Sequence, residues 1–203
     1  MLNNYLKYLE FINEKIEKFF NRQKEYIFCK KGCGLCCKNA QFPFSKIEMQ
    51  YLFIGCKDLD AGTFNKIEEN IEKIIKQKKN FKGEKFTYDC PFLINNVCSV
   101  YNHRGIVCRS FGLMTIIQNT DKKNKVPFCY AKNLNYSNVI DFETQQVSGK
   151  KFKEGGFIEE PLAFNVSYDF LTSKDFEESF NFKFGEKKPI IDWFSDKSLN
   201  IKQ

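Results

Sequence analysis

The sequence predicts an α+β protein: a mainly helical, cysteine-rich domain with short strands, followed by a C-terminal extension. Three observations lead to this prediction. Apolar residues recur at helical spacing up to about residue 80, and short β-like runs follow between residues 86 and 130. All nine cysteines lie at or before position 129. We therefore expect residues 1–130 to form the cysteine-rich domain and residues 131–203 to form an extension that packs on it.

The N-terminal part of the chain is expected to contain three helices. Apolar residues at steps of three and four predict an amphipathic helix over about residues 2–24. Ser45 and Glu48 have the spacing of a capping box, which predicts that a second helix begins at Ser45. A stripe of Phe and Ile predicts a third helix over about residues 63–79, and the lysines at its end suit the negative pole of the helix dipole.

Shorter elements are expected after residue 86. Residues 97–101 form a β-like run, and residues 113–118 and 125–130 are placed to pair across a turn over 119–124. A last helix is expected from about residue 173 to 180. The extension also contains many aromatic residues, which we expect to pack onto the domain or to line a binding groove.

Eight of the nine cysteines fall into two groups of four, and we expect all eight to bind metal. They are Cys29, Cys33, Cys36, Cys37, Cys90, Cys98, Cys108 and Cys129. Four plus four thiols is the number that two all-thiolate centres require, and it equally suits one four-cysteine cluster surrounded by the other thiols. Cys56 lies outside both groups, and we expect it to be a small buried residue.

The nature of the metal follows from the ligands that the chain offers. It has a single histidine, so any large site would be nearly pure sulfur, and thiolates select zinc or iron–sulfur clusters over magnesium, calcium or manganese. The adjacent pair Cys36 and Cys37 is expected to reach different metal atoms or different centres. This pair and the absence of histidine ligands favour a [4Fe–4S] cluster over isolated zinc. Disulfides, reversible redox thiols and cysteines as core filler are the alternatives.

Two arginines and the histidine lie close to the second cysteine group in the sequence. Arg104 and Arg109 flank Cys108, so either one could offset the negative charge of a thiolate-bound cofactor, the alternative being a surface ion pair. His103 lies in the motif YNHRG and is expected to be a turn residue and not a ligand.

Charge and compartment exclude several classes of protein. The formal net charge of +7 comes with 29 Lys and only three Arg, which leaves no obvious set of nucleic-acid readers. The N-terminus has no apolar run of signal-peptide length, and no segment has the roughly 18 apolar residues of a membrane helix. We therefore expect a cytoplasmic protein that binds neither nucleic acid nor membranes, in a compartment where thiols stay reduced.

These residues resemble a known group of bacterial proteins. The runs GCGLCC, FPFS, CPFL and the later C-R-x-F are similar to those of the YkgJ-type cysteine-cluster family, a zinc- or iron-chelating domain with a CxxCxxCC signature. The signature is represented by the first cysteine group, with three residues instead of two in its first gap. Members usually have proline after the equivalent of Arg104, whereas this chain has Gly105, so the helix start there is expected to differ. The resemblance covers roughly residues 29–130.

The resemblance implies a metal-binding function, and the chemistry is left between two possibilities. One is an iron–sulfur protein that supports redox or methyl-transfer chemistry, since flagellin lysine N-methylases have a distantly similar cysteine cluster. The other is a non-catalytic zinc module that holds the fold or an interaction together. The partner would be an unidentified protein or small molecule.

Overall fold

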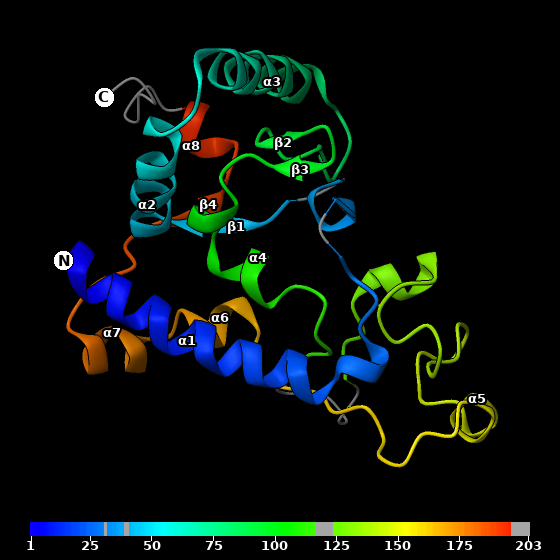
Figure 1. Ribbon diagram of the computed structural model, residues 1–203. Helices are drawn as coiled ribbons and strands as arrows, with labels where there is room; N and C mark the ends of the chain where they lie inside the picture. The colour runs from blue at the N-terminus through cyan, green and yellow to red at the C-terminus, as the bar shows by residue number, and fades with distance from the viewer. Residues whose placement is uncertain (31, 39–40, 117–123, 196–203) are drawn as a thin grey trace.

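The computed structural model describes residues 1–30, 32–38, 41–116 and 124–195, and its longest element is α1 (Leu2–Arg22), which lies along one side of the molecule (Figure 1). The predicted helix over 2–24 is confirmed, except that its last turn is a separate 3-10 helix, η1 (Lys24–Tyr26). The buried face of α1 has the expected spacing of three and four residues. Its members are Tyr5, Tyr8, Leu9, Ile12 and Ile16.

The other two predicted helices of the N-terminal part are also present. In α2 (Lys46–Lys57) both halves of the capping box form: the backbone N–H of Glu48 donates to Ser45 Oγ, and that of Ser45 donates to the Glu48 carboxylate. α3 (Ala61–Asn80) begins where the Asp60 side chain accepts a hydrogen bond from the backbone of Thr63. Figure 1 shows both helices on the same side of α1.

Two small antiparallel sheets complete the centre of the structure. β1 (Pro43–Ser45) pairs with β4 (Lys187–Pro189), which joins segments from opposite ends of the chain. β2 (Leu93–Ile94) and β3 (Val97–Cys98) form a hairpin. The two residues of its turn, Asn95 and Asn96, both have positive φ, as a type I′ turn requires.

Two of the sequence predictions for strands were only partly right. The extended run predicted over 97–101 ends after Cys98, and Tyr101–His103 form the 3-10 helix η3. In the described residues, the predicted pairing of 113–118 with 125–130 is represented by one bridge, between Thr115 and Lys125; residues 117–123, which include most of the predicted turn, lie outside the described part of the chain. Pro127 stops the second strand because it has no N–H to donate, and η4 (Phe128–Lys132) follows it.

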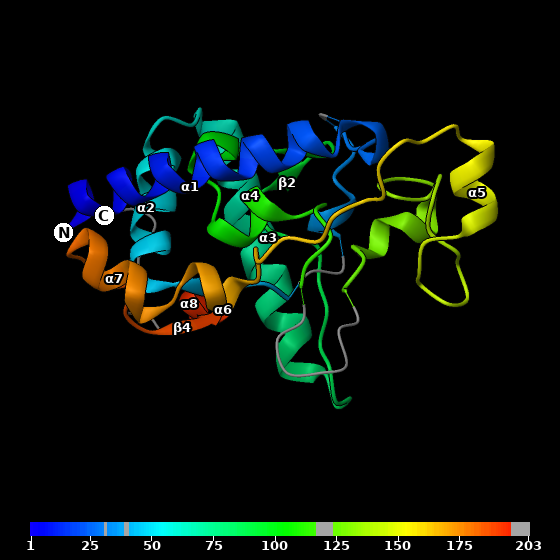
Figure 2. The same cartoon turned by 90° about the horizontal axis from the view of Figure 1, so that it is seen from below.

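The remaining helices are short, and most belong to the C-terminal third of the chain. α4 (Ile106–Ser110) leads out of η3, and α5 (Gly149–Glu154) lies in a lobe at one end of the molecule (Figure 2). α6 (Tyr168–Leu171), α7 (Lys174–Phe180) and α8 (Asp192–Ser195) lie near α1 and α2. The helix predicted over 173–180 is therefore confirmed, and so is the α+β class. None of the helices in the described part of the chain is long and apolar enough to cross a membrane.

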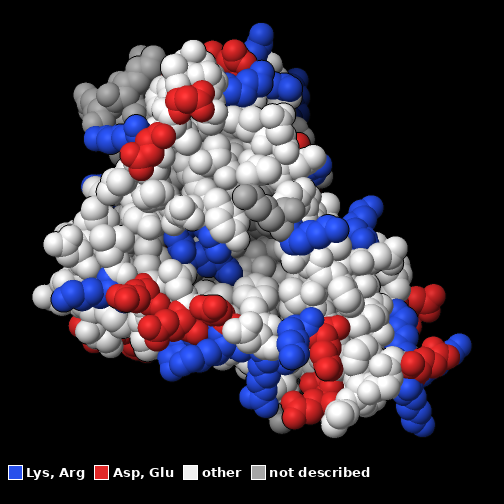
Figure 3. Space-filling view, viewed as in Figure 1, with Lys and Arg blue, Asp and Glu red and all other residues white. Residues whose placement is uncertain are grey.

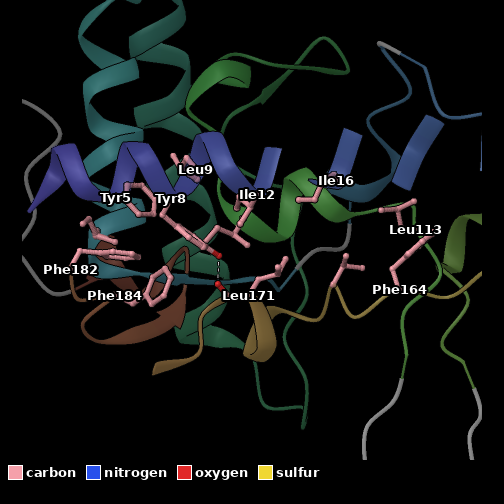
Figure 4. Packing of buried hydrophobic residues seen from close by; sticks show 13 residues of the cluster. Tyr5, Tyr8, Leu9, Ile12, Ile16, Leu113, Phe164, Leu171, Phe182 and Phe184 are labelled. Atoms are coloured by element: carbon pink, nitrogen blue, oxygen red, sulfur yellow. Dashed lines mark hydrogen bonds between the residues drawn. The ribbon is translucent and has the colours of Figure 1, made fainter. Parts of the chain in front are cut away.

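The hydrophobic core beneath α1 is built from residues far apart in the sequence (Figure 4). Tyr5 and Tyr8 pack on Phe182 and Phe184 from the segment after α7, with ring centroids 5.4–6.5 Å apart. The buried Tyr8 hydroxyl donates a hydrogen bond to the carbonyl of Leu171 in α6. We call this group of residues the α1 core.

A second cluster lies between α2, α3 and the last strand. It contains Ile67 and Ile71 of α3 together with Ile190, Ile191 and Trp193 near the C-terminus. The cysteines at positions 90, 98 and 108 pack against it. A third cluster, around Tyr26 and Tyr136, connects the α5 lobe to the rest. Residues after 130 therefore contribute buried side chains to all three clusters.

Candidate metal centre

Five of the eight candidate ligands line one small cavity. They are Cys36, Cys37, Cys90, Cys98 and Cys108. The cavity has a volume of about 80 Å³, several times the roughly 10–15 Å³ that one water molecule needs. Its other walls are mostly apolar, with Phe44, Leu52 and Phe92 among them. The structure therefore brings together two cysteine groups that are more than fifty residues apart in the sequence.

A short 3-10 helix, η2 (Leu35–Cys37), presents the first two of these thiols. Gly34 precedes it with a φ of +59°, and a Cβ at this position would lie 3.2 Å from the carbonyl oxygen of Asn96 in the hairpin turn. Glycine is therefore needed both for the left-handed backbone and for the close approach of the hairpin. The backbone N–H of Cys90 donates to the carbonyl of Cys37 at 2.7 Å, which joins the two cysteine groups directly.

The other thiols reach the cavity from the hairpin and from α4. Cys98 ends β3, and the backbone and side chain of Ser99 both donate to the carbonyl of Phe92. Cys108 lies in α4, whose first residue, Ile106, donates its N–H to Glu48 Oε1 at 2.8 Å. Glu48, which belongs to the capping box of α2, thus also holds in place the helix that carries Cys108.

Three candidate ligands lie outside this cavity: Cys29, Cys33 and Cys129. Cys29 is exposed, Cys33 is half-buried and Cys129 is buried. All nine cysteines are free thiols, so no disulfide joins any of them. In the arrangement seen, no three Cys, His, Asp or Glu side chains of the described residues converge closely enough to hold a metal ion. Side-chain rotation would have to draw the thiols together on binding.

A comparison with protein families supports the importance of these cysteines. The family named "CxxCxxCC: Putative zinc- or iron-chelating domain" matches residues 28–130, which is half of the chain. The chain belongs to the CxxCxxCC family. Among curated proteins and among solved structures, none matches this chain. The matched range contains every candidate ligand.

The thiols of this CxxCxxCC protein are mostly held in their neutral form. Burial raises the pKa of Cys90 to about 12. The pKa of Cys108 is raised well above its usual value, mainly by burial and to a smaller extent by the charges of neighbouring cysteines. The Sγ atoms of Cys36 and Cys37 lie 3.9 Å apart, and the hydrogen bond between them lowers the pKa of Cys36 to about 7 while it raises that of Cys37. Several thiols cannot ionise together in so small a space unless a cation joins them.

Arg104 borders the cysteine cavity. Its guanidinium lies over the Tyr101 ring at 3.9 Å and donates a hydrogen bond to the Tyr101 carbonyl. Its positive charge helps to lower the pKa of Cys36, and it also lowers that of Cys98 against the larger effect of burial. Among the described residues it forms no ion pair with a carboxylate. The alternative that it forms a surface ion pair therefore has no support in this part of the chain.

Arg109 has a different place from that of Arg104. Its guanidinium is buried and donates three hydrogen bonds: to the carbonyls of Arg104 and Asn102 and to Asn13 Oδ1 in α1. On the face shown in Figure 3, basic side chains border a hollow near the place that α4 occupies in Figure 1. Through its hydrogen bonds to the carbonyls of Asn102 and Arg104, Arg109 holds the segment that carries Arg104, and it does not itself line the cysteine cavity.

His103 and Cys56 are found as the sequence predicts, His103 in a turn and Cys56 as a buried residue. His103 is in η3, and its ring packs on Tyr51 with centroids 4.7 Å apart. A Cβ on Gly55 would lie 2.5 Å from this ring, so α2 needs glycine at the contact. Cys56 is buried in α2, and burial raises the pKa of its thiol. The negative charge of an ionised Cys98 raises this pKa further.

Gly105 differs from the family pattern in its surroundings, not in its backbone. It caps α4 with a φ of −65°, a value that proline also has. A Cβ at Gly105 would, however, lie 2.5 Å from the ring of Phe44 and 3.0 Å from Glu48 Oε1. The backbone at Gly105 could therefore accommodate proline, so the start of α4 does not differ in conformation as expected. The difference lies in packing, because the ring of Phe44 occupies the space that a proline side chain would need.

Sequence reasoning missed two buried polar residues that organise the site. Glu48 was identified only as a helix cap, yet its carboxylate also accepts hydrogen bonds from Ile106 N and from the Tyr168 hydroxyl at 2.6 Å. Burial raises its pKa. Asn135 is fully buried and accepts hydrogen bonds from the N–H groups of Phe28 and Cys29. No local signal marked either role, because the partners lie 58–120 residues away.

Proposed function

We propose that this protein holds an all-thiolate metal centre in the cysteine cavity, with Cys36, Cys37, Cys90, Cys98 and Cys108 as its ligand set. The observation that carries the proposal is that five thiols from three separate segments line one small, mostly apolar cavity. No Asp or Glu is among the described residues that line the cavity, and soft thiolates suit zinc or iron. Membership of a zinc- or iron-chelating family supports the same conclusion.

An iron–sulfur cluster of the [4Fe–4S] type is the form of this centre that we propose first. Four thiolates hold such a cluster, and the cavity offers one more than that number and no histidine. When bound, the cluster would supply one-electron chemistry. The resemblance to YkgJ-type proteins and, more distantly, to flagellin lysine N-methylases makes redox or methyl-transfer reactions the activities to test.

A structural zinc site is the second candidate, and one distance favours it. A tetrahedral zinc with Zn–S bonds of about 2.3 Å places its sulfur atoms about 3.8 Å from one another. The Sγ atoms of Cys36 and Cys37 are already 3.9 Å apart. This separation suits two ligands of one ion, in contrast to the expectation that Cys36 and Cys37 reach different metal atoms or different centres. A closed zinc site would serve only to hold η2, the hairpin and α4 together.

Arg104 and Arg109 have separate functions under either candidate. Four thiolates on a divalent ion leave a net charge of about −2, and Arg104 at the cavity edge offsets part of it. Arg109 keeps Arg104 in place through two hydrogen bonds to the backbone of residues 102 and 104. We therefore propose Arg104 as the residue that tunes the centre and Arg109 as a positioning residue.

The setting of the centre follows from the same reasoning. We propose that the protein works in the reducing cytoplasm, where nine free thiols persist. We also propose that the division at residue 130 is one of function: residues 1–130 hold the metal, and residues 131–203 select a protein or small-molecule partner while sharing the core.

Metal and sulfide analysis after anaerobic purification tests the proposal. Iron together with acid-labile sulfide, in a brown protein, would support the [4Fe–4S] form. Stoichiometric zinc without sulfide would support the structural site and reject the cluster. Nine freely titratable thiols in folded, freshly isolated protein would reject both.

A further inference from the structure

The helix that carries Cys108 is held by the C-terminal extension through a buried carboxylate. Glu48 is fully buried, and it accepts hydrogen bonds from Ile106 N at the start of α4 and from the Tyr168 hydroxyl in α6. We propose that Tyr168 and Glu48 are positioning residues of the cavity centre: α6 sets the place of α4, and with it that of the Cys108 thiol. This inference rests on the proposed metal centre and gives the extension control over it.

Glu48 depends on neutral donors for its place in the core. Its Oε2 accepts hydrogen bonds from the N–H and the hydroxyl of Ser45 at 2.8 and 2.7 Å and from Tyr168 at 2.6 Å. Its Oε1 accepts one from Ile106 N at 2.8 Å. None of the ion pairs among the described residues involves this carboxylate. Because a buried carboxylate that loses a donor must shift toward another partner, removal of the Tyr168 hydroxyl should displace the group that holds the start of α4.

The place of Tyr168 is itself fixed by β4. Lys187 lies opposite Ser45 in the pairing of β4 with β1, and its Nζ donates to the carbonyl and the hydroxyl of Thr172 at the end of α6, at 2.9 and 2.7 Å. The same ammonium lies 5.7 Å from the centroid of the Tyr168 ring. The sheet that joins the two ends of the chain therefore brings the Tyr168 hydroxyl to Glu48.

A second contact links the same stretch of the extension to the other end of α4. The Ser110 hydroxyl donates to the carbonyl of Val166, two residues before Tyr168, at 3.3 Å. Because α4 is only five residues long, it is not stable through its own hydrogen bonds and needs contacts to hold it. Cys108 lies between the two ends of α4 that these contacts hold. The position of Cys108 therefore depends on the segment that carries Val166 and Tyr168.

Removal of one hydroxyl tests this coupling. Tyr168→Phe keeps the aromatic ring and loses only the hydrogen bond to Glu48. Tyr8→Phe is the matched control, because the Tyr8 hydroxyl also bonds to α6, at the Leu171 carbonyl, and not to the carboxylate. Circular dichroism and thermal melting identify the temperatures at which both variants are as folded as the wild type, and all comparisons are made there.

Alkylation of Cys108 in metal-free protein measures the position of α4. We expect iodoacetamide to modify Cys108 about fivefold faster in Tyr168→Phe than in the wild type, the factor expected for the loss of one hydrogen bond. Cys56, which is buried in α2 and does not line the cavity, is the internal reference in the same peptide mass spectra. Tyr8→Phe should leave the ratio of the two rates unchanged. An unchanged ratio in Tyr168→Phe, or an equal rise in both variants, would overturn the proposal.

Removal of the metal by EDTA measures the consequence for the centre. Protein isolated with its metal is titrated with EDTA, and the metal that remains bound after gel filtration is measured. We expect half-removal at an EDTA concentration about fivefold lower in Tyr168→Phe than in the wild type, and no change in Tyr8→Phe. Equal EDTA midpoints for the wild type and Tyr168→Phe would overturn the control of the centre by α6. A wild type that carries no metal would reject the proposed function itself, and the alkylation ratio would then decide alone whether Tyr168 positions Cys108.

Discussion

The α1 core and the cysteine region are held together by different physical means. The α1 core packs a long helix on aromatic side chains from α6, α7 and the segment after them, and it buries Tyr5, Tyr8 and Phe184 almost completely (Figure 4). The described elements that carry the five cavity cysteines are short: the 3-10 helix η2, the hairpin of β2 and β3, and the five-residue helix α4. The α1 core is made of large apolar side chains, whereas the second region places five thiols along the edge of its apolar cluster. We therefore expect the second region, and not the α1 core, to depend on the proposed metal for its order.

Removal of residues 131–203 should have the largest effect, because it breaks the α1 core. The truncated chain loses Phe164, Leu171, Phe182 and Phe184 from this core and the whole of β4. We expect no cooperative thermal transition by circular dichroism and no retained metal. A truncated protein that melts cooperatively with its metal would show that the cysteine region folds independently of the α1 core.

Loss of a cavity ligand should affect the cysteine region next most strongly. Cys108→Ala is expected to release the cavity metal and to lower the melting temperature, because the energy of metal binding is also energy of folding. Cys56→Ala is the matched control, since Cys56 is buried close by in α2 and its removal costs about 1 kcal/mol. Metal analysis and thermal melting of both variants decide the matter. Full metal content in Cys108→Ala would remove this residue from the ligand set.

A cavity in the α1 core should lower stability without loss of metal per folded molecule. Tyr8→Ala is expected to cost about 3–5 kcal/mol, as do other aromatic truncations in cores. Tyr8→Phe removes only the hydrogen bond to the Leu171 carbonyl and should cost about 1 kcal/mol. Urea unfolding combined with metal analysis measures both quantities. If Tyr8→Ala released metal from protein that remains folded, the two regions would not be energetically separate.

The smallest expected effect is a pH dependence that differs with and without metal. In the metal-free protein, burial raises the pKa of Cys90 to about 12 and that of Cys129 to about 11, compared with about 8.5 for an unfolded cysteine. Because the folded state favours the neutral thiols, their stabilisation is complete below pH ~8.5 and is lost as the pH rises toward 11–12. The metal-bound protein already holds thiolates and should not show this loss. Urea midpoints at increasing pH, with metal-free Cys90→Ala as the control, measure the difference; an equal slope in both forms would contradict it.

Local patterns were sufficient for the three longest helices of this protein, although not for the short helices α4, α5, α6 and α8. The apolar spacing of α1 and α3 and the capping box of α2 involve residues no more than four apart, so nothing distant was needed to recognise them. The hairpin of β2 and β3 was missed, although Asn95 and Asn96 are residues that tolerate the positive φ of its turn. Of the strand pairing expected after residue 113, the described residues show the bridge between Thr115 and Lys125, and Pro127 prevents its continuation; Thr115 also pairs with Phe164, far along the chain.

By itself, the sequence determined the α+β class, the main helices and the membership of a thiolate-rich, metal-chelating family, since these depend on residue type and short spacing. Only the tertiary structure decided which of the cysteines lie together in one cavity and which lie outside it. Five of them meet in one cavity because β1 pairs with β4, Glu48 holds α4, and the backbone of Cys90 bonds to that of Cys37. Asn135 joins Cys29 to the turn of Cys129 across more than one hundred residues. Such contacts depend on the summed packing of the whole chain, which no local pattern records.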